Sequence, residues 1–242
     1  MQEKVAKAFD QLAVAYASSV DQSSGHNAYY ERPAMMKLLP EDLTDMTVLD
    51  AGCAAGWYTA QLLERGAAVT AIDLSQAMVA ACRRRVGNQA NVMVHDLSQP
   101  LPFEDESFDL IVSSLTLHYI EDWDSVLTEF RRVLKPNGQL LFSVHHPFMV
   151  YQQFDQQDYF ARELLTDIWN KKETGPVEVT FYHKSMMDIV NSTTKHFTLD
   201  QMIEPQPSED FIDQPGALDW YKRWYDRLMR DPWFLIVKAL KT

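Results

Sequence analysis

Acidic side chains follow three successive apolar runs that are predicted to be strands. Asp50 and Asp73 end the first two runs, and Asp96 ends the third. Because ligands of an open α/β sheet bind outside the carboxyl ends of its strands, we expect these carboxylates to face one crevice. Asp73 lies about 20 residues after Gly52, where a carboxylate accepts hydrogen bonds from both hydroxyls of a ribose. The alternatives are local: Asp73 as a helix cap and Asp96 as a turn residue.

A glycine-containing turn joins the first predicted strand to a helix, in the segment VLDAGCAAG at residues 48–56. Glycine lets the backbone approach a ligand closely, and the following helix N-terminus offers unpaired N–H groups to an anion. A dinucleotide fingerprint requires glycines at positions 52, 54 and 57. The chain has Gly52, Ala54 and Trp57 at these positions. The spacing therefore disfavours a pyrophosphate cradle and a nicotinamide-dependent dehydrogenase.

Three histidines follow the fourth and fifth predicted strands and belong to the same edge of the sheet. His118 follows the fourth strand, and His145 and His146 follow the fifth. A neutral imidazole at this edge can accept a proton from a reacting group, so His118 and His146 are the candidate catalytic residues. Packing or hydrogen bonding to backbone is the alternative for each. A metal site of His145, His146 and His183 is less favoured, because spacing alone does not fix ligands, and no metal is predicted.

The elements that must position these residues alternate as βα units, which is typical of an α/β fold with a doubly wound, mostly parallel sheet. Strands are expected at 47–50, 68–72, 92–95, 108–113, 139–144, 198–203 and 233–240, and helices at 5–16, 57–64, 75–85, 123–134, 186–195 and 218–229. A turn is expected at 135–138, where proline and glycine follow the fourth of these helices. Residues 148–170 are expected to be helical or irregular, and 177–182 to form an exposed strand.

Composition excludes several classes of protein. The 242 residues hold 34 acidic and 22 basic side chains, a net charge of −12, which argues against a nucleic-acid partner. The two cysteines indicate neither a disulfide framework nor a zinc site. The sequence contains no run of about 18 apolar residues that would span a membrane. We therefore expect a cytoplasmic protein with no membrane partner.

Three segments of the sequence, taken together, resemble the class I S-adenosylmethionine-dependent methyltransferases. VLDAGCAAGWYTAQLLERGAAVTAIDLSQAMV is similar to the first two motifs of that family. LPFEDESFDLIVSSLTLHYIEDW and LTEFRRVLKPNGQLLFSVHHP resemble the later motifs of its ubiquinone-biosynthesis-type small-molecule branch. Ala54 replaces the middle glycine of the family's first motif. The resemblance implies a Rossmann-like doubly wound sheet of about seven strands, with the last strand antiparallel and an inserted cap.

The resemblance also implies roles for single residues toward S-adenosylmethionine, whose product would be S-adenosylhomocysteine. Gly52 would contact the methionine part of the cofactor, and Asp50 would order that loop. Asp73 would hold the ribose, Asp96 the adenine amino group, and the Leu97 N–H the adenine ring. Further contacts are implied for Leu74 and Met78 against the adenine, for Ser113 and Ser114 under the methionine moiety, and for Tyr16, with Tyr29 or Tyr30, closing over it.

The chain is expected to divide into three parts. Residues 1–46 would form an N-terminal helical lid, 47–145 and 232–242 the cofactor-binding core, and 146–231 a cap that selects the acceptor and contributes the sixth strand. Aromatic residues gather in that last segment, either as a pocket or as ordinary core: Tyr151, Tyr159, Trp169, Tyr182, Trp220 and Trp224.

The predicted function is methyl transfer from S-adenosylmethionine to a small molecule. One alternative is a protein that binds S-adenosylmethionine or S-adenosylhomocysteine without transferring a methyl group, and a third is a nicotinamide-dependent dehydrogenase. The acceptor, the atom that is methylated and the oligomeric state are left open by the sequence.

Overall fold

Seven strands form one mixed sheet in the computed structural model, which describes residues 1–154, 158–214 and 216–242. The strand order is β3-β2-β1-β4-β5-β9-β8, in which β1 to β5 are parallel and β9 runs antiparallel between β5 and β8. The strands are β1 Thr47–Ala51, β2 Ala68–Asp73, β3 Asn91–Val94, β4 Phe108–Ser114, β5 Leu134–His145, β8 Thr198–Ile203 and β9 Phe234–Leu240. The predicted α/β fold, with an antiparallel last strand, is confirmed.

Helices cover both faces of this sheet because neighbouring residues on a strand point to opposite sides. Val48 packs with Leu62 on the face that α4 covers, and Leu49 packs with Phe130 on the face that α6 covers. Apolar residues on both faces are typical of a sheet buried between two helical layers. The helices of these layers are α4 Trp57–Glu64 and α5 Gln76–Val86 on one face, and α6 Trp123–Val133 and α8 Met186–His196 on the other.

The connection from α6 to β5 differs from the prediction of a turn at 135–138. The strand begins at Leu134, directly after α6, and runs without a break to His145. Asn137 has a positive φ of 64°, and the pairing with β4 shifts between Phe108 and Leu110. This irregular stretch is hydrogen-bonded to the residue that follows β9, since the Asn137 N–H donates to the Lys241 carbonyl at 2.9 Å. The proline and glycine therefore mark a distortion within the strand, which contact with the end of β9 holds in place.

Two further strands form a separate antiparallel hairpin, which was not predicted as such. β6 Leu164–Lys171 pairs with β7 Gly175–Tyr182 along its whole length. Residues 148–170 hold the short helix α7 Pro147–Gln153 and most of β6, while 155–157 lie outside the described residues. The predicted strand at 177–182 exists but is not exposed. Val177, Val179 and Phe181 are buried with residues of α1, which covers that face of the hairpin.

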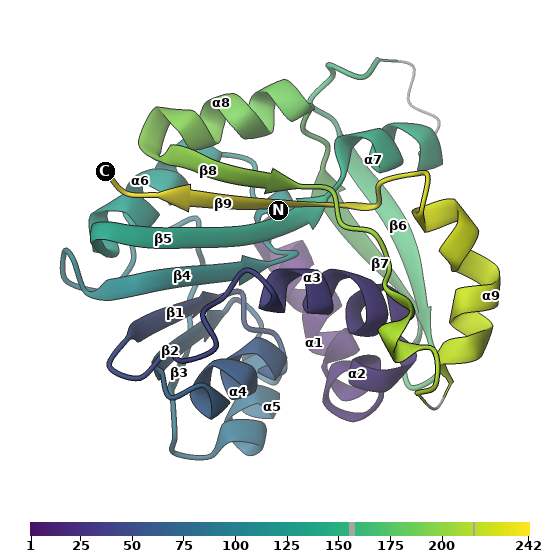
Figure 1. Cartoon of the computed structure of the whole chain (residues 1–242), viewed down its shortest axis with the longest axis horizontal. Coiled ribbons are helices and arrows are strands. Elements are labelled where there is room, and N and C mark those ends of the chain that lie inside the picture. The colour runs from purple at the N-terminus through teal and green to yellow at the C-terminus, as the bar shows by residue number, and fades with distance from the viewer. Residues whose placement is uncertain (155–157, 215) are drawn as a thin grey trace.

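The N-terminal segment lies beyond the carboxyl ends of the parallel strands, together with the hairpin (Figure 1). The elements there are α1 Gln2–Ser18, α2 Val20–Ser23, the π-helical turn η1 Asn27–Glu31, α3 Arg32–Met36 and α9 Ala217–Leu228, with the 3₁₀ turns η2 Leu117–Tyr119 and η3 Glu209–Phe211. In α1, Val5, Leu12 and Ala13 lie on the predicted apolar face and are buried against α5 and β7. The segment covers the strand ends.

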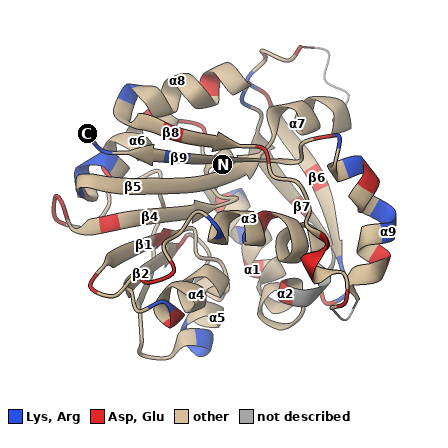
Figure 2. Cartoon of the chain, viewed as in Figure 1, with Lys and Arg blue, Asp and Glu red and all other residues tan. Residues whose placement is uncertain are grey.

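Charged residues are distributed over many elements (Figure 2). Lys and Arg occur at the end of α5, at the end of α6, at the end of α8 and along α9. Acidic residues lie between them, so the positive charge is spread over the fold. Within the ranges that the structure describes, no helix combines the length and the apolar character needed to cross a membrane.

Candidate functional site

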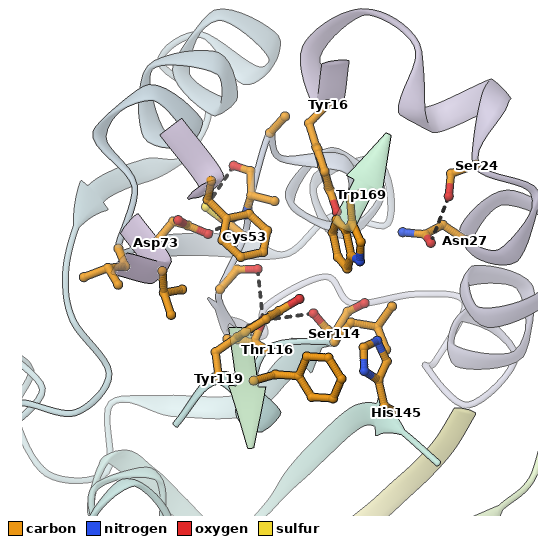
Figure 3. A pocket seen from close by; sticks show the side chains of 18 of the residues that line it. Tyr16, Ser24, Asn27, Cys53, Asp73, Ser114, Thr116, Tyr119, His145 and Trp169 are labelled. Carbon is orange, nitrogen blue, oxygen red and sulfur yellow. Dashed lines mark hydrogen bonds between the residues drawn. The ribbon is translucent and has the colours of Figure 1, made fainter. Parts of the chain in front are cut away.

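A cavity of about 360 Å³ lies at the carboxyl ends of the parallel strands, under α1 and the β6–β7 hairpin. Residues from the loops after β1, β2, β3 and β4 line one part of it. Figure 3 shows Asp73 on one side of the cavity and His145, Ser24 and Asn27 on the other, with Tyr16 and Trp169 between them in this view. We call the side formed by Asp73 and Asp96 the acidic end.

The loop after β1 is shaped by left-handed backbone conformations. Gly52 and Gly56 have φ of 88° and 81°. A Cβ on Gly52 would lie 2.1 Å from the Thr116 Oγ1, so glycine is required for this loop to pack against the segment after β4. Ala54 also has a positive φ, of 45°, a conformation that costs a non-glycine residue about 1 kcal/mol. The alanine at the family's middle-glycine position therefore retains the glycine-like turn with some strain.

Asp50 supports this loop from below and does not line the cavity. Its carboxylate is 1% exposed and accepts a hydrogen bond from the Thr59 Oγ1 at 2.6 Å. Burial raises the pKa of Asp50 to about 7. Gly52, in contrast, lines the cavity directly. The structure thus places Asp50 where it can order the turn, out of reach of a ligand.

Asp73 connects two loops and lines the cavity. One carboxylate oxygen accepts from the Ala54 N–H at 2.9 Å, and the other accepts from the Ser75 N–H at 2.8 Å. Burial raises the pKa of Asp73 to about 6. A carboxylate has about four lone-pair sites, so two remain for a ligand. Leu74 also lines the cavity, whereas Met78 is fully buried beneath it, in contact with α1.

The loop after β3 completes the acidic end. His95, Asp96 and Leu97 line the cavity in succession. One Asp96 oxygen accepts from the Ser98 N–H at 2.8 Å, as a turn residue would, and lone pairs remain for a ligand. Asp73 and Asp96 therefore face the same cavity from adjacent strands.

The two serines at the end of β4 point in different directions. The Ser113 hydroxyl donates to the Ala51 carbonyl at 2.8 Å and is fully buried between β4 and β1. The Ser114 hydroxyl donates to Glu31 at 2.8 Å. Ser114 lines the cavity, as does Thr116. Ser114 therefore faces the ligand space, and Ser113 lies beneath it.

The three tyrosines predicted to close over the cofactor also differ in whether they line the cavity. Tyr16 of α1 lines the cavity, and burial raises its pKa to about 12. Tyr30 instead donates to the Pro205 carbonyl at 2.8 Å and packs against Phe234. Tyr29 packs with residues of η3 and α9. The structure brings only Tyr16 of these three into contact with the cavity.

The candidate catalytic residues His118 and His146 do not line the cavity, whereas His145 does. The His146 Nε2 lies 2.8 Å from Glu204, and its Nδ1 accepts from the Phe148 N–H to cap α7. His118 is buried behind His145, with ring centroids 4.1 Å apart and nearly parallel planes. His145 lines the cavity, and burial lowers its pKa to about 4. Of the three imidazoles, His145 is therefore the one that a cavity ligand can reach.

No group of three or more potential ligands that could hold a metal ion is found in the described part of the chain. His183, considered for a metal site with His145 and His146, has its Nε2 at 2.8 Å from the Tyr159 carbonyl. His146 is engaged by Glu204. The three imidazoles are thus directed to different partners.

Arg32, for which the sequence pattern predicts no function, lines the cavity and is almost fully buried. Its Nη2 pairs with Asp21 at 2.9 Å, and Asp21 is shared with Arg85 at 2.5 Å. The guanidinium carbon lies 4.3 Å from the centre of the Trp57 ring. The Arg32 Nη1 is buried without a hydrogen-bond partner among the described residues. Asp21 thus serves two cations, and the Arg32 Nη1 keeps a donor free for an acceptor on a ligand.

Glu31 holds Arg32 in place. It is fully buried and accepts from the Ser143 hydroxyl at 2.5 Å, the Ser114 hydroxyl at 2.8 Å and the Tyr58 hydroxyl at 3.0 Å. Burial raises its pKa. These bonds fix η1 to the ends of β4 and β5. The start of α3, and with it Arg32, is positioned by this network.

Several known proteins are similar in sequence to part or most of this chain. The family described as Methyltransferase domain matches residues 49–142, from β1 into β5. An uncharacterized protein of Haemophilus influenzae is 30% identical over 238 residues, which cover 89% of each chain. A malonyl-[acyl-carrier protein] O-methyltransferase of Buchnera aphidicola is 32% identical over 142 residues, 58% of this chain and 54% of that protein. The chain thus spans about half the length of this second relative.

A solved structure has the same fold. The crystal structure of a candidate S-adenosylmethionine dependent methyltransferase from Listeria monocytogenes has a TM-score of 0.70 and 26% identity. The match covers 88% of this chain and 96% of that one. The likeness therefore extends over most of this chain and nearly all of that one.

Proposed function

Because this chain belongs to the class I S-adenosylmethionine-dependent methyltransferases, we propose that it methylates a small molecule bound in the cavity at the strand ends. The observation that carries this proposal is a shared cavity. Gly52 and Asp73, from the predicted donor-binding loops, and the His145 imidazole all line it. A donor and an acceptor bound there would be held side by side.

The residues at the acidic end fit the nucleoside part of S-adenosylmethionine. We propose that Asp73 accepts from the ribose hydroxyls and Asp96 from the adenine amino group, because both carboxylates keep free lone pairs in the cavity. Leu74 and Leu97 line the same end of the cavity and would contact the adenine ring. Asp50, Met78 and Ser113 would act from beneath, by supporting the loops.

We assign the carboxylate of the methionine moiety to Arg32. Its Nη1 is a buried donor without a partner in the described chain, and such a donor in a cavity calls for an acceptor. A guanidinium–carboxylate hydrogen bond is charge-assisted and stronger than a neutral one. Tyr16 and Ser114 line the cavity as well and would flank the same moiety.

When bound, S-adenosylmethionine supplies a methyl group on a positively charged sulfur. The chain's own contribution is to hold the acceptor in line with that methyl group and to keep water away. Phe9, Tyr16 and Trp169 cover the cavity from α1 and β6 and would exclude water. Burial lowers the pKa of His145 to about 4, so the neutral ring keeps a lone pair, and this weak base can take a proton from a hydroxyl whose oxygen becomes strongly acidic as it is methylated.

We also propose that the chain belongs to the small-molecule branch that its later motifs resemble. The cavity is covered by α1 and the hairpin, which favours an acceptor small enough to be enclosed. In this respect the proposal differs from the relatives named malonyl-[acyl-carrier protein] O-methyltransferases, whose substrate is attached to a protein. Residues 146–231, as the proposed acceptor-selecting cap, supply the hairpin.

Paired histidine variants test the proposed function. With small hydroxyl, amine and thiol compounds, the wild type should convert S-adenosylmethionine to S-adenosylhomocysteine. His145→Asn should lower kcat by about 10²-fold or more, the usual contribution of a general base. His146→Asn should keep kcat, because asparagine also caps helices and His146 does not line the cavity.

The pH dependence provides a second readout for the same pair. Because the His145 pKa is lowered to about 4, its proton-accepting form is lost only as pH falls through about 4. The wild-type rate should therefore show no titration of this group near pH 6.5. An unchanged kcat in His145→Asn, or equal losses in both variants, would contradict the assignment.

A further inference from the structure

A second polar cluster lies in the part of the cavity that α2, η1 and the hairpin tip form. We call it the lid end, and it consists of Ser24, His26, Asn27 and Lys171. The Trp220 indole N–H donates to the His26 Nδ1 at 3.3 Å. An indole nitrogen is a donor only, so the Nδ1 must be the acceptor and the proton of the neutral ring lies on Nε2. This Nε2–H is buried and has no partner in the described ranges.

Lys171 brings a positive charge to the same end. It is the last residue of β6, and alternation along the strand places Asp167, Trp169 and Lys171 on the face that lines the cavity. Its ammonium group forms no ion pair with any carboxylate of the described residues, and burial lowers its pKa. Asp167 is four residues away along the strand, about 13 Å, which is too far for an ion pair.

The charges around His26 are mainly positive. Lys171, Arg223 and Arg227 all act electrostatically on the ring and disfavour its protonated form. Arg227 lies over the rings of Trp224 and Trp233, which also contact His26. Two carboxylates offset part of this charge: Glu173, exposed at the hairpin tip two residues after Lys171, and Asp231, which lies 3.7 Å from the Arg227 guanidinium. A protein with a net charge of −12 therefore has a locally basic, aromatic-walled pocket here.

The proposed roles for the methyl donor leave this cluster unused. The nucleoside part is assigned to Asp73 and Asp96, and the methionine carboxylate to Arg32. Figure 3 shows Asn27 and Ser24 on the side of the cavity away from Asp73. One ammonium group and one neutral N–H donor match a group with one negative charge and two oxygens, whereas a phosphate would bring nearly two charges.

We propose that the methyl acceptor carries a carboxylate that binds between the Lys171 ammonium group and the His26 Nε2–H. This inference rests on the proposed methyl transfer and adds the chemical class of the acceptor. Trp233 and Phe234 line the cavity nearby and would contact an apolar or aromatic body attached to that carboxylate. The carboxylate anchors the acceptor, so that another part of it lies toward His145.

Matched carboxylate and amide probes test this inference. Calorimetric titration of the S-adenosylhomocysteine complex with phenylacetate, 3-phenylpropionate, 4-hydroxyphenylacetate and the primary amide of each compares probes of equal size. For at least one pair the carboxylate should bind about tenfold or more tightly than the amide, as a charge-assisted contact predicts. Lys171→Gln should remove that preference, and His26→Phe, which keeps the ring packing, should reduce it.

The adjacent Lys172 supplies the control, because it is exposed and does not line the cavity. Lys172→Gln should keep the carboxylate preference, and all variants should bind S-adenosylhomocysteine as the wild type does. Equal binding of every carboxylate and its amide, or equal losses in the two lysine variants, would overturn the inference. Weaker S-adenosylhomocysteine binding by Lys171→Gln alone would also overturn it, by placing Lys171 on the donor. A wild type that binds no S-adenosylhomocysteine would instead refute the proposed function.

Discussion

At the scale of single residues, partially satisfied polar groups mark the places where ligands are expected. Arg32 uses one guanidinium nitrogen for Asp21 and keeps another buried without a partner in the described structure. Leaving such a donor unpaired costs about 1–3 kcal/mol, which a bound carboxylate would recover. Glu31 differs because three hydroxyls satisfy it. We therefore propose that Arg32 binds a ligand and that Glu31 positions it.

Ligands with and without a carboxylate test the role of Arg32. Arg32→Gln should weaken S-adenosylmethionine binding by about tenfold or more, since a charge-assisted hydrogen bond is lost. Binding of decarboxylated S-adenosylmethionine should change little. Calorimetric titration measures both dissociation constants, and Arg84→Gln, on the exposed side of α5, is the control. Equal losses for both ligands would show that Arg32 supports the fold and not the carboxylate.

The sequence allowed some of these residues to be predicted and concealed others. Asp73 and Asp96 were placed at the sheet edge because strand ends can be recognised from apolar runs. His145 and His146 are adjacent, and which of them lines the cavity depends on where β5 stops, which the pattern does not define to one residue. Arg32 was missed because its partners, Asp21 and Arg85, come from distant segments.

At the scale of elements, α1 is attached to the core through a side chain that caps the N-terminus of another helix, α5. The Asp10 carboxylate accepts from the Ser75 hydroxyl at 2.5 Å and from the Ala77 N–H at 3.1 Å. Asp10 thereby helps to satisfy the first turn of α5, which also begins beside Asp73. Docking of α1 brings Tyr16 over the cavity. The helix thus connects the packing of the N-terminal segment to the loop that bears Asp73.

Removal of this cap tests the connection. Asp10→Ala should lower the free energy of unfolding by about 1 kcal/mol, the usual effect of losing a helix cap, and should weaken S-adenosylmethionine binding. Urea denaturation and calorimetric titration measure the two effects. Glu3→Ala, which removes an exposed ion pair with Lys7 on the same helix, should change neither. Wild-type cofactor affinity in Asp10→Ala would separate α1 from the donor site.

The hairpin shows why one element could not be recognised from the sequence. A strand is predicted from alternating apolar residues, but in β6 the inward positions include Asp167 and Lys171, which line a cavity. The functional face therefore lacks the apolar pattern that a core-facing strand has. In β7 the inward residues Val177, Val179 and Phe181 pack on α1, and that strand was predicted, although as exposed.

At the scale of the whole molecule, the cavity is assembled from segments that are far apart in the chain. The loops after the parallel strands form the acidic end, and α2, η1 and β6 form the lid end. Alternation of strands and helices was sufficient to predict the sheet, because each βα unit is a local pattern. The lid end depends on contacts between residues near 26, 171 and 220, and no local pattern carries that information.

Calorimetric titration of the wild type and Asp73→Ala tests whether S-adenosylmethionine binds at the acidic end. We expect saturable binding of one cofactor per chain and a dissociation constant about 10- to 100-fold higher in Asp73→Ala, because hydrogen bonds to a charged group are lost. Asp73→Ala should retain the wild-type circular dichroism spectrum. Absence of binding to the wild type, or an unchanged dissociation constant in the variant, would contradict cofactor binding at the acidic end.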